Sequence, residues 1–161
     1  MAHKIRIACL GTSDHLSRAV DALLKDDVIP AENIFLSKAD GPEIERFAAN
    51  GCQLLTDDMN AIIKGEVVLI AAPSEEMAAV LAPVCGCTSG RYLIAVSDRV
   101  SVSDIADRIA KGTQIMAVQT AQQEDGTLHG TVDYSKGFAP YMKLPCEDIA
   151  RALVDTLTIS E

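Results

Sequence analysis

The chain has 161 residues, of which 48% are hydrophobic and 23% charged, so we expect one globular domain over residues 1–161 and exclude a disordered or collagen-like chain. Its 23 acidic residues outnumber its 14 basic residues, and the net charge of -9 excludes nucleic acid as a partner because like charges repel. Aromatic residues make up only 4% of the chain, which predicts an aliphatic core.

The sequence gives no sign of export or membrane insertion. Arg6 interrupts the first apolar run, and no apolar run reaches the roughly 18–20 residues that cross a bilayer. The five cysteines are scattered and odd in number, which is typical of free thiols in a reducing compartment. We therefore expect a cytoplasmic protein with no membrane partner. The pair Cys85 and Cys87 suggests metal or redox chemistry, but common zinc sites have a two-residue gap; we expect no metal, and ordinary loop thiols are the alternative.

The first half of the chain alternates short β-branched runs with helical patterns. Strands are predicted at residues 5–10, 33–37, 53–55 and 67–72, the last as a central strand because its apolar run is unbroken. Helices are predicted at 13–25, near 42–50, and from Asp57 or Asp58, either of which can cap the helix, to a stop at Gly65.

The second half continues the alternation. A helix capped by Ser74 is predicted to about Val84, a strand at 92–96, a helix from Ser101 to about 110, and a sixth strand at 113–118. Residues 122–137 are predicted to form a loop or small hairpin, and Pro145 is predicted to precede a last helix over 146–157. The fold class is therefore α/β: a three-layer, doubly wound, mostly parallel Rossmann-like sheet, whose ligands bind beyond the carboxyl ends of its strands.

The loop after the first strand is the first candidate site. A dinucleotide fingerprint G-x-G-x-x-G/A would need glycine at positions 11, 13 and 16, but only Gly11 fits, because Ser13 and Leu16 occupy the other two. Asp14 would compete with a phosphate for the amides at the helix N-terminus. The alternative is that Ser13 or Asp14 simply caps the helix.

The end of the second strand is the second candidate site. An acidic residue at this point selects NAD through the ribose hydroxyls, whereas Ser37 and Lys38 favour the additional phosphate of NADP. The alternative is that Lys38 is a solvated loop charge.

The order of segments resembles the N-terminal nucleotide-binding domain of the pyrroline-5-carboxylate reductase family. The resemblance covers nearly the whole chain and is carried by these segments: Lys4-Ile5-Arg6-Ile7, Leu10-Gly11, Val28 to Ile34, Thr56 to Asn60, Glu66 to Ala71, Ile94 to Ser101 and Cys146 to Leu153. It implies a domain that binds NADP or NAD, with NADP favoured, and that belongs to an imine-reducing enzyme of the proline-biosynthesis type. The cofactor residues that it implies are Gly11, Thr12, Ser13, His15, Leu16, Ser37, Lys38, Ala72 and Pro73.

The chain departs from the family at the motifs. The Lys-Pro after the fourth strand is reduced to Ala72-Pro73, an Ala-Gly after the fifth strand is replaced by Asp98-Arg99, and a Met-Pro-Asn-Thr-Pro is replaced by residues 117–121 without either proline. The family's second, all-helical domain, which dimerises and helps to form its reducing site, would begin where this chain ends. We therefore expect that the chain alone does not reduce an imine.

No catalytic residue is assigned from the sequence. His15 could act as a general acid or be a surface histidine, and Arg99 could bind a carboxylate or phosphate or pair with a neighbouring aspartate. Tyr134 and Lys136 could act together as an acid pair, although no spacing supports this role. The function is then an NAD(P)-binding oxidoreductase domain with a dinucleotide and a small-molecule substrate as partners; the alternatives are a non-catalytic module that has lost the cofactor site, or a piece of a longer reductase.

Overall fold

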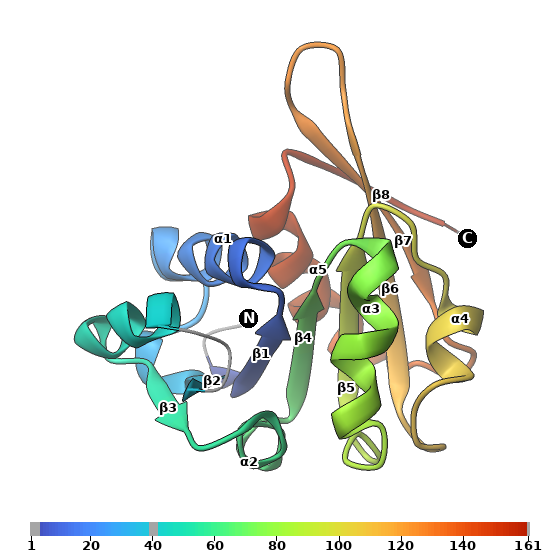
Figure 1. Ribbon diagram of the computed structural model, residues 1–161. Coiled ribbons are helices and arrows are strands. Elements are labelled where there is room, and N and C mark those ends of the chain that lie inside the picture. Colours follow the sequence, from blue (N-terminus) through green and yellow to red (C-terminus); the bar gives the residue numbers. More distant parts are fainter. Residues whose placement is uncertain (1–3, 39–41, 161) are drawn as a thin grey trace.

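The computed structural model describes residues 4–38 and 42–160, which form an α/β fold around one eight-stranded sheet (Figure 1). The strand order is β3-β2-β1-β4-β5-β6-β7-β8. The strands are β1 (Ile7–Gly11), β2 (Ile34–Ser37), β3 (Gln53–Leu55), β4 (Val67–Ala71), β5 (Tyr92–Ser97), β6 (Gln114–Gln122), β7 (Leu128–Tyr134) and β8 (Thr156–Ile159). Neighbouring strands are parallel except β6 and β7, which form an antiparallel hairpin.

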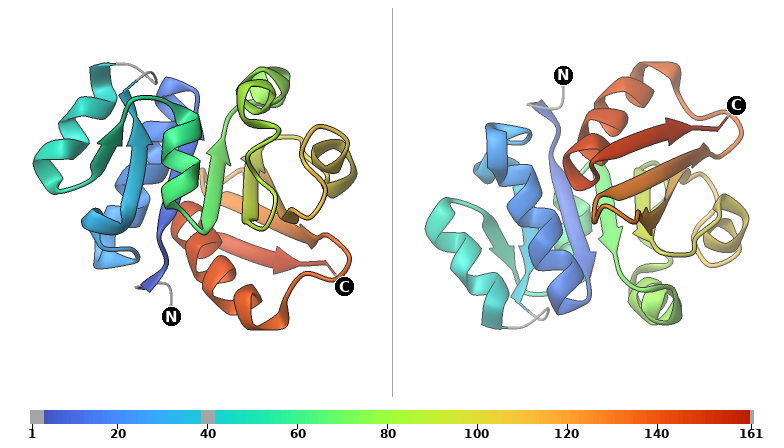
Figure 2. Two further views of the ribbon diagram at one scale, coloured as in Figure 1. Left: turned by 90° about the horizontal axis from the view of Figure 1, so that it is seen from below. Right: turned by 90° about the horizontal axis from the view of Figure 1, so that it is seen from above.

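Helices cover both faces of the sheet, and Figure 2 shows the resulting layers from both ends. The α-helices are α1 (Ser13–Leu24), α2 (Asp58–Lys64), α3 (Ser74–Leu81), α4 (Val102–Ala106) and α5 (Pro140–Leu153). Short 3-10 helices are η2 (Lys25–Asp27), η3 (Ala31–Asn33), η5 (Pro42–Asn50) and η6 (Ala82–Val84). One hydrophobic cluster lies under α1, η5 and α5, and a second lies under α2, α3 and α4.

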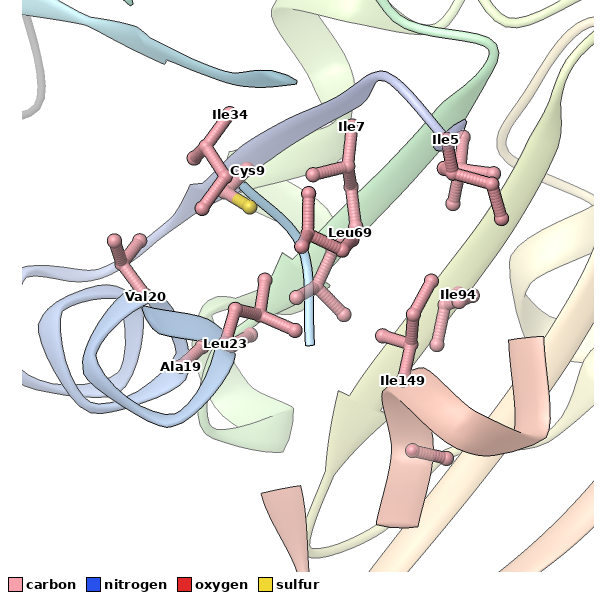
Figure 3. Packing of buried hydrophobic residues seen from close by; sticks show 14 of the residues in the cluster. Ile5, Ile7, Cys9, Ala19, Val20, Leu23, Ile34, Leu69, Ile94 and Ile149 are labelled. Atoms are coloured by element: carbon pink, nitrogen blue, oxygen red, sulfur yellow. The ribbon is translucent and has the colours of Figure 1, made fainter. Parts of the chain in front are cut away.

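Alternate side chains of each central strand belong to different hydrophobic clusters. In β1, Ile7 and Cys9 belong to the first cluster, whereas Ala8 and Leu10 belong to the second. Because alternate side chains point to opposite faces, a strand buried on both faces must be apolar throughout, and β4 is buried at every position. Figure 3 shows side chains from α1, α5 and the central strands gathered in the first cluster.

The first half of the chain confirms the predicted elements, with boundaries that shift by one or two residues. The segment at 42–50 is a 3-10 helix. At the start of α2, the Asp57 carboxylate accepts a hydrogen bond from the Asn60 backbone N–H at 2.8 Å, so of the two predicted caps Asp57 is the correct one.

In the second half, the elements predicted between residues 74 and 118 are confirmed as α3, β5, α4 and β6, although α4 already ends at Ala106. Two strands, β7 and β8, follow the six that were predicted, and of the loop or small hairpin expected at 122–137 the structure has the hairpin. Residues 128–134 form strand β7, paired with β6 in register from Met116↔Tyr134 to Gln122↔Leu128. The hairpin stands beyond the helical layers in Figure 1. Its polar outer residues made this strand indistinguishable from a loop, and the turn is held by the Asp125 carboxylate, which accepts from the Thr127 N–H and hydroxyl at 3.0 and 2.6 Å.

The predicted last helix over 146–157 is also wrong at both ends. Helix α5 begins at Pro140, where proline is favoured because the first helical N–H needs no partner, and Pro145 lies buried inside the helix. The helix ends at Leu153, and residues 156–159 form β8, parallel to β7. Among the described residues, no helix has the length and apolarity needed to cross a membrane.

Candidate functional site

Gly11 ends β1 at a close approach to β4. Its φ is +152°, and a Cβ built on it would lie 2.0 Å from the carbonyl oxygen of Ala71. The next residue, Thr12, donates its backbone N–H to the same oxygen at 3.3 Å. Only glycine therefore fits the turn that leads from the carboxyl end of β1 into α1.

The N-cap residue of α1 makes no side-chain hydrogen bond to the helix. Thr12 is the N-cap residue, but its hydroxyl lies 3.4 Å from Nδ1 of His15 and makes no bond to the helix amides. Ser13 is the first helical residue and Asp14 follows it, exposed in the first turn, so the alternative that either of them caps the helix is wrong. The first helical amides are the groups that bind a phosphate at such an end.

Leu16 takes the place of the third glycine of a dinucleotide fingerprint. Its side chain is fully buried in the cluster between α1 and the sheet, together with Val20 and Leu23 one and two turns later. It therefore packs the helix against the strands, and only its backbone could face a ligand.

The end of β2 lies at the same edge of the sheet as the β1–α1 loop, because β1 and β2 are parallel. Ser37 is fully buried and Lys38 is exposed. Residues 39–41, which include Asp40, lie outside the described part of the chain. The structure thus brings Lys38 to the edge where it was expected, while the buried Ser37 hydroxyl points away from solvent.

A cavity of about 260 Å³ opens at the carboxyl ends of the central strands, beside α1. Drug-sized ligands usually occupy roughly 300–1,000 Å³, so the cavity has room for a small molecule or for one end of a larger ligand. Its wall is apolar along Ala71, Val96 and Leu153, and polar along the lining residues His15, Arg18, Ser97, Asp98 and Thr120. His15 is one of the residues predicted from the sequence as cofactor-binding, and among those whose side chains the structure describes it alone lines the cavity.

Ala72 and Pro73, also expected at the site, form the connection from β4 to α3. Ala72 is fully buried and donates its N–H to the Val96 carbonyl at 3.3 Å, while Pro73 is the N-cap residue of α3. Their side chains do not line the cavity, whereas the neighbouring Ala71 does.

Asp98 links the two loops that follow β4 and β5. Its carboxylate accepts from the Ser74 N–H at 2.9 Å and from the Ser97 hydroxyl at 3.2 Å. The Ser74 amide, more than any other group, lowers the pKa of Asp98, since a hydrogen bond to the charged form stabilises it. The prediction that Ser74 caps α3 is wrong, because Ser74 is the first helical residue and the cap comes from Asp98. The only sequence signal was an acidic residue directly after a strand.

The other candidate residues do not assemble into a catalytic group. Within residues 4–38 and 42–160, Arg99 is exposed and makes no ion pair. The Tyr134 hydroxyl donates to Glu147 of α5, and burial together with this carboxylate raises the pKa of the tyrosine. The exposed Lys136 is not its partner; Lys143 lies over the tyrosine ring, 4.9 Å from its centre.

Strand β6 runs past the cavity without a break. Where the resembling family has two prolines, residues 117–121 keep a continuous ladder with β7 that includes Thr120↔Gly130 and Ala121↔His129. Proline would remove a ladder N–H, so its loss allows the strand to continue. The extended hairpin brings Thr120 and Leu128 to the cavity, and sequence reasoning had placed neither residue there.

No protein-family model matches the sequence, and no curated protein matches it. Solved structures do. Pyrroline carboxylate reductase of Plasmodium falciparum with NADP bound has a TM-score of 0.78 at 12% identity, over 99% of this chain and 58% of its own. Pyrroline-5-carboxylate reductase of Coxiella burnetii has a TM-score of 0.80 at 14% identity, over 99% of this chain and 60% of its own.

An imine reductase of Streptomyces aurantiacus is also similar, with a TM-score of 0.68 at 13% identity, over 96% of this chain and 54% of its own. The chain thus spans about 58–60% of the length of the two pyrroline carboxylate reductases. Identities this low establish likeness of fold, and the chain has the Rossmann-like α/β fold that these reductases share.

Proposed function

We propose that this chain binds NADP(H) and is the nucleotide-binding part of an oxidoreductase that reduces an imine or a related small molecule. The observation that carries the proposal is the N-terminus of α1, which follows the Gly11 turn at the carboxyl edge of the sheet and whose N-cap residue, Thr12, makes no side-chain hydrogen bond to the helix amides. The first amides of the helix therefore lie where a pyrophosphate would bind, and the Thr12 hydroxyl does not occupy them. The shared fold with a reductase that holds NADP supports the same assignment.

Three parts of the chain would contact the cofactor. The backbone N–H groups that follow the Gly11 turn, from Ser13 onward, would hold the pyrophosphate, because the Thr12 N–H already donates to the Ala71 carbonyl. Lys38 would pair with the additional ribose phosphate that distinguishes NADP from NAD. The cavity beside Ala71 would receive the reacting end of the cofactor or the substrate. The bound cofactor supplies the hydride, and the chain's own part is to orient it.

Reduction by this chain alone is not part of the proposal. His15 lines the cavity and has the chemistry of a general acid, but its Nδ1 lies 3.4 Å from the Thr12 hydroxyl, and among the described residues no base orients it. We infer that a further domain or a second chain completes the reducing site. A cytoplasmic setting agrees with five cysteines that form no disulfide in the structure.

Asp14 favours a second candidate function, a binding module that has lost its cofactor. Its exposed carboxylate lies in the first turn of α1, where it stabilises the helix dipole and would repel a phosphate. The two candidates differ in one measurable quantity, which is the affinity of the chain for NADPH.

Calorimetric titration with NADPH, NADP⁺ and NADH tests the proposal. We expect binding, with NADPH tighter than NADH by about tenfold through a charge-assisted contact to Lys38. Lys38→Ala should remove this preference and leave NADH binding unchanged. Absence of heat for all three cofactors at millimolar concentration would contradict the proposal and support the module.

Asp14→Asn should tighten NADPH binding by a few-fold, because it removes an interaction of about 0.3–1 kcal/mol between a carboxylate and the helix terminus that the phosphate would replace. Asp107→Asn is the matched control, since it makes the same charge change at the exposed C-terminal end of α4. Leu16 should be left unchanged in these experiments. It is fully buried, so its replacement would lower the stability of the fold as well as change the affinity for the cofactor. Equal effects of the two aspartate variants would show that only net charge matters.

A further inference from the structure

The loop between α3 and β5 carries two thiols that the proposed cofactor site does not use. Cys85 is exposed and Cys87 is half-buried, whereas Cys9, Cys52 and Cys146 are buried. We propose that Cys85 and Cys87 form a redox-active dithiol that closes to a disulfide when a low-molecular-weight disulfide, such as glutathione disulfide, oxidises it.

The backbone holds the two cysteines at the right separation. Cys85 has φ -56° and ψ -29°, and the Cys87 N–H donates to the Val84 carbonyl at 2.9 Å, so Cys85 and Gly86 are the central residues of a tight turn. Successive Cα atoms are about 3.8 Å apart, and the bend of such a turn brings the Cα atoms of residues 85 and 87 to about 5.5 Å. This lies inside the roughly 4.4–6.8 Å range of disulfides.

Both cysteines are anchored through their carbonyl groups. Ala110 donates its N–H to the Cys85 carbonyl at 2.8 Å, and Nη1 of Arg91 donates to the Cys87 carbonyl at 3.2 Å. Between them, a Cβ on Gly86 would meet nothing within 4 Å. The loop is therefore fixed on both sides of an open glycine, which leaves room for the small ring that the disulfide closes.

The structure favours redox chemistry over metal binding at this pair. Within the described ranges, no three His, Cys, Asp or Glu side chains come together as metal ligands, whereas a structural zinc site needs four. Two other thiols of the chain compete little for the oxidant, because burial raises the pKa of Cys52 to about 11 and that of Cys146 to about 12. The thiolate is the reactive form, so these buried groups react slowly.

The oxidation is an exchange of disulfides in two steps. The exposed Cys85 thiolate attacks one sulfur of glutathione disulfide, breaks its S–S bond and releases one glutathione thiolate. The Cys87 thiolate then attacks the Cys85 sulfur of this mixed disulfide and releases the second glutathione. The protein loses two electrons and two protons, and glutathione disulfide gains them to become two glutathione molecules.

The test treats the folded full chain with glutathione disulfide, blocks the remaining thiols with N-ethylmaleimide and measures the tryptic peptide 65–91, whose only cysteines are Cys85 and Cys87. We expect a peptide lighter by two hydrogens and without maleimide. Cys87→Ser should instead accumulate glutathione on Cys85, with the mixed disulfide disappearing on the order of a hundredfold more slowly than in the wild type, because an intramolecular thiol acts at a high effective concentration.

Cys52→Ser is the control and should oxidise as the wild type does. Circular dichroism before and after oxidation shows whether the fold is kept, and maleimide should not label Cys52 or Cys146 in the native chain. A wild type that stops at the mixed disulfide, forms only intermolecular dimers, or loses glutathione no faster than Cys87→Ser would overturn the proposal.

Discussion

Replacement of Gly11 by alanine should destabilise the whole sheet. The new methyl carbon would lie 2.0 Å from the Ala71 carbonyl oxygen, where ordinary contacts begin at about 3.4 Å, so β1 and β4 must separate by more than an ångström at this register pair. Backbone strain at φ +152° adds about 1–3 kcal/mol, and overpacking of a tight contact adds about 1–3 kcal/mol. We expect the free energy of unfolding to fall by about 2–6 kcal/mol.

Urea denaturation followed by circular dichroism measures this loss. Gly86→Ala is the matched control, since its Cβ meets no atom within 4 Å, and it should change the free energy of unfolding by less than about 0.5 kcal/mol. If Gly11→Ala does not fold, the same comparison can be made by its yield of soluble protein against Gly86→Ala. Equal unfolding midpoints for Gly11→Ala and the wild type would refute the steric reasoning.

Two further variants test local contacts. Asp57→Ala removes the cap of α2 and should lower the free energy of unfolding by about 1 kcal/mol in urea denaturation, whereas Asp57→Ser, which keeps an acceptor, should lower it less. The folded-state pKa of Asp98 is lowered, so its bonds stabilise the fold above its ordinary pKa of about 3.9 and are lost as the pH falls through the lower folded value. Urea midpoints of wild type and Asp98→Asn should therefore converge as the pH falls below about 4; a gap that stays constant from pH 7 to pH 3 would contradict this.

The first half of the fold was predictable because each of its elements has one strong local signal. The unbroken apolar run at 67–71 is buried on both faces, and Asp57 and Gly65 mark the ends of α2. The last third of the chain was less predictable, because Thr156-Leu157-Thr158-Ile159 alternates like a strand while following a helix without a glycine or proline between them. Pro145 also misled the prediction, since neighbouring contacts in the core keep a proline inside α5.

In the candidate site, the position fixed by local backbone geometry was predictable from the sequence. The contacts between segments far apart in the chain were not. Gly11 was identified from its place between a strand and a helix, and the structure gives the steric reason for it. The contact of Asp98 with Ser74, and the approach of Leu128 to the cavity, join residues far apart in the chain. No local pattern records such a contact, because it depends on strand order and on the length of the β6–β7 hairpin.

The free edge at β8 has a consequence for how the protein behaves in concentrated solution. Residues 156–159 contain no charged residue and no proline, the two devices that most often stop an exposed strand from pairing with another molecule. Protection therefore falls to the net charge of -9, which keeps copies apart at neutral pH. Near the isoelectric point of about 4.7 this repulsion vanishes, and the uncharged edge strands β3 and β8 then lose their main protection against pairing with another molecule.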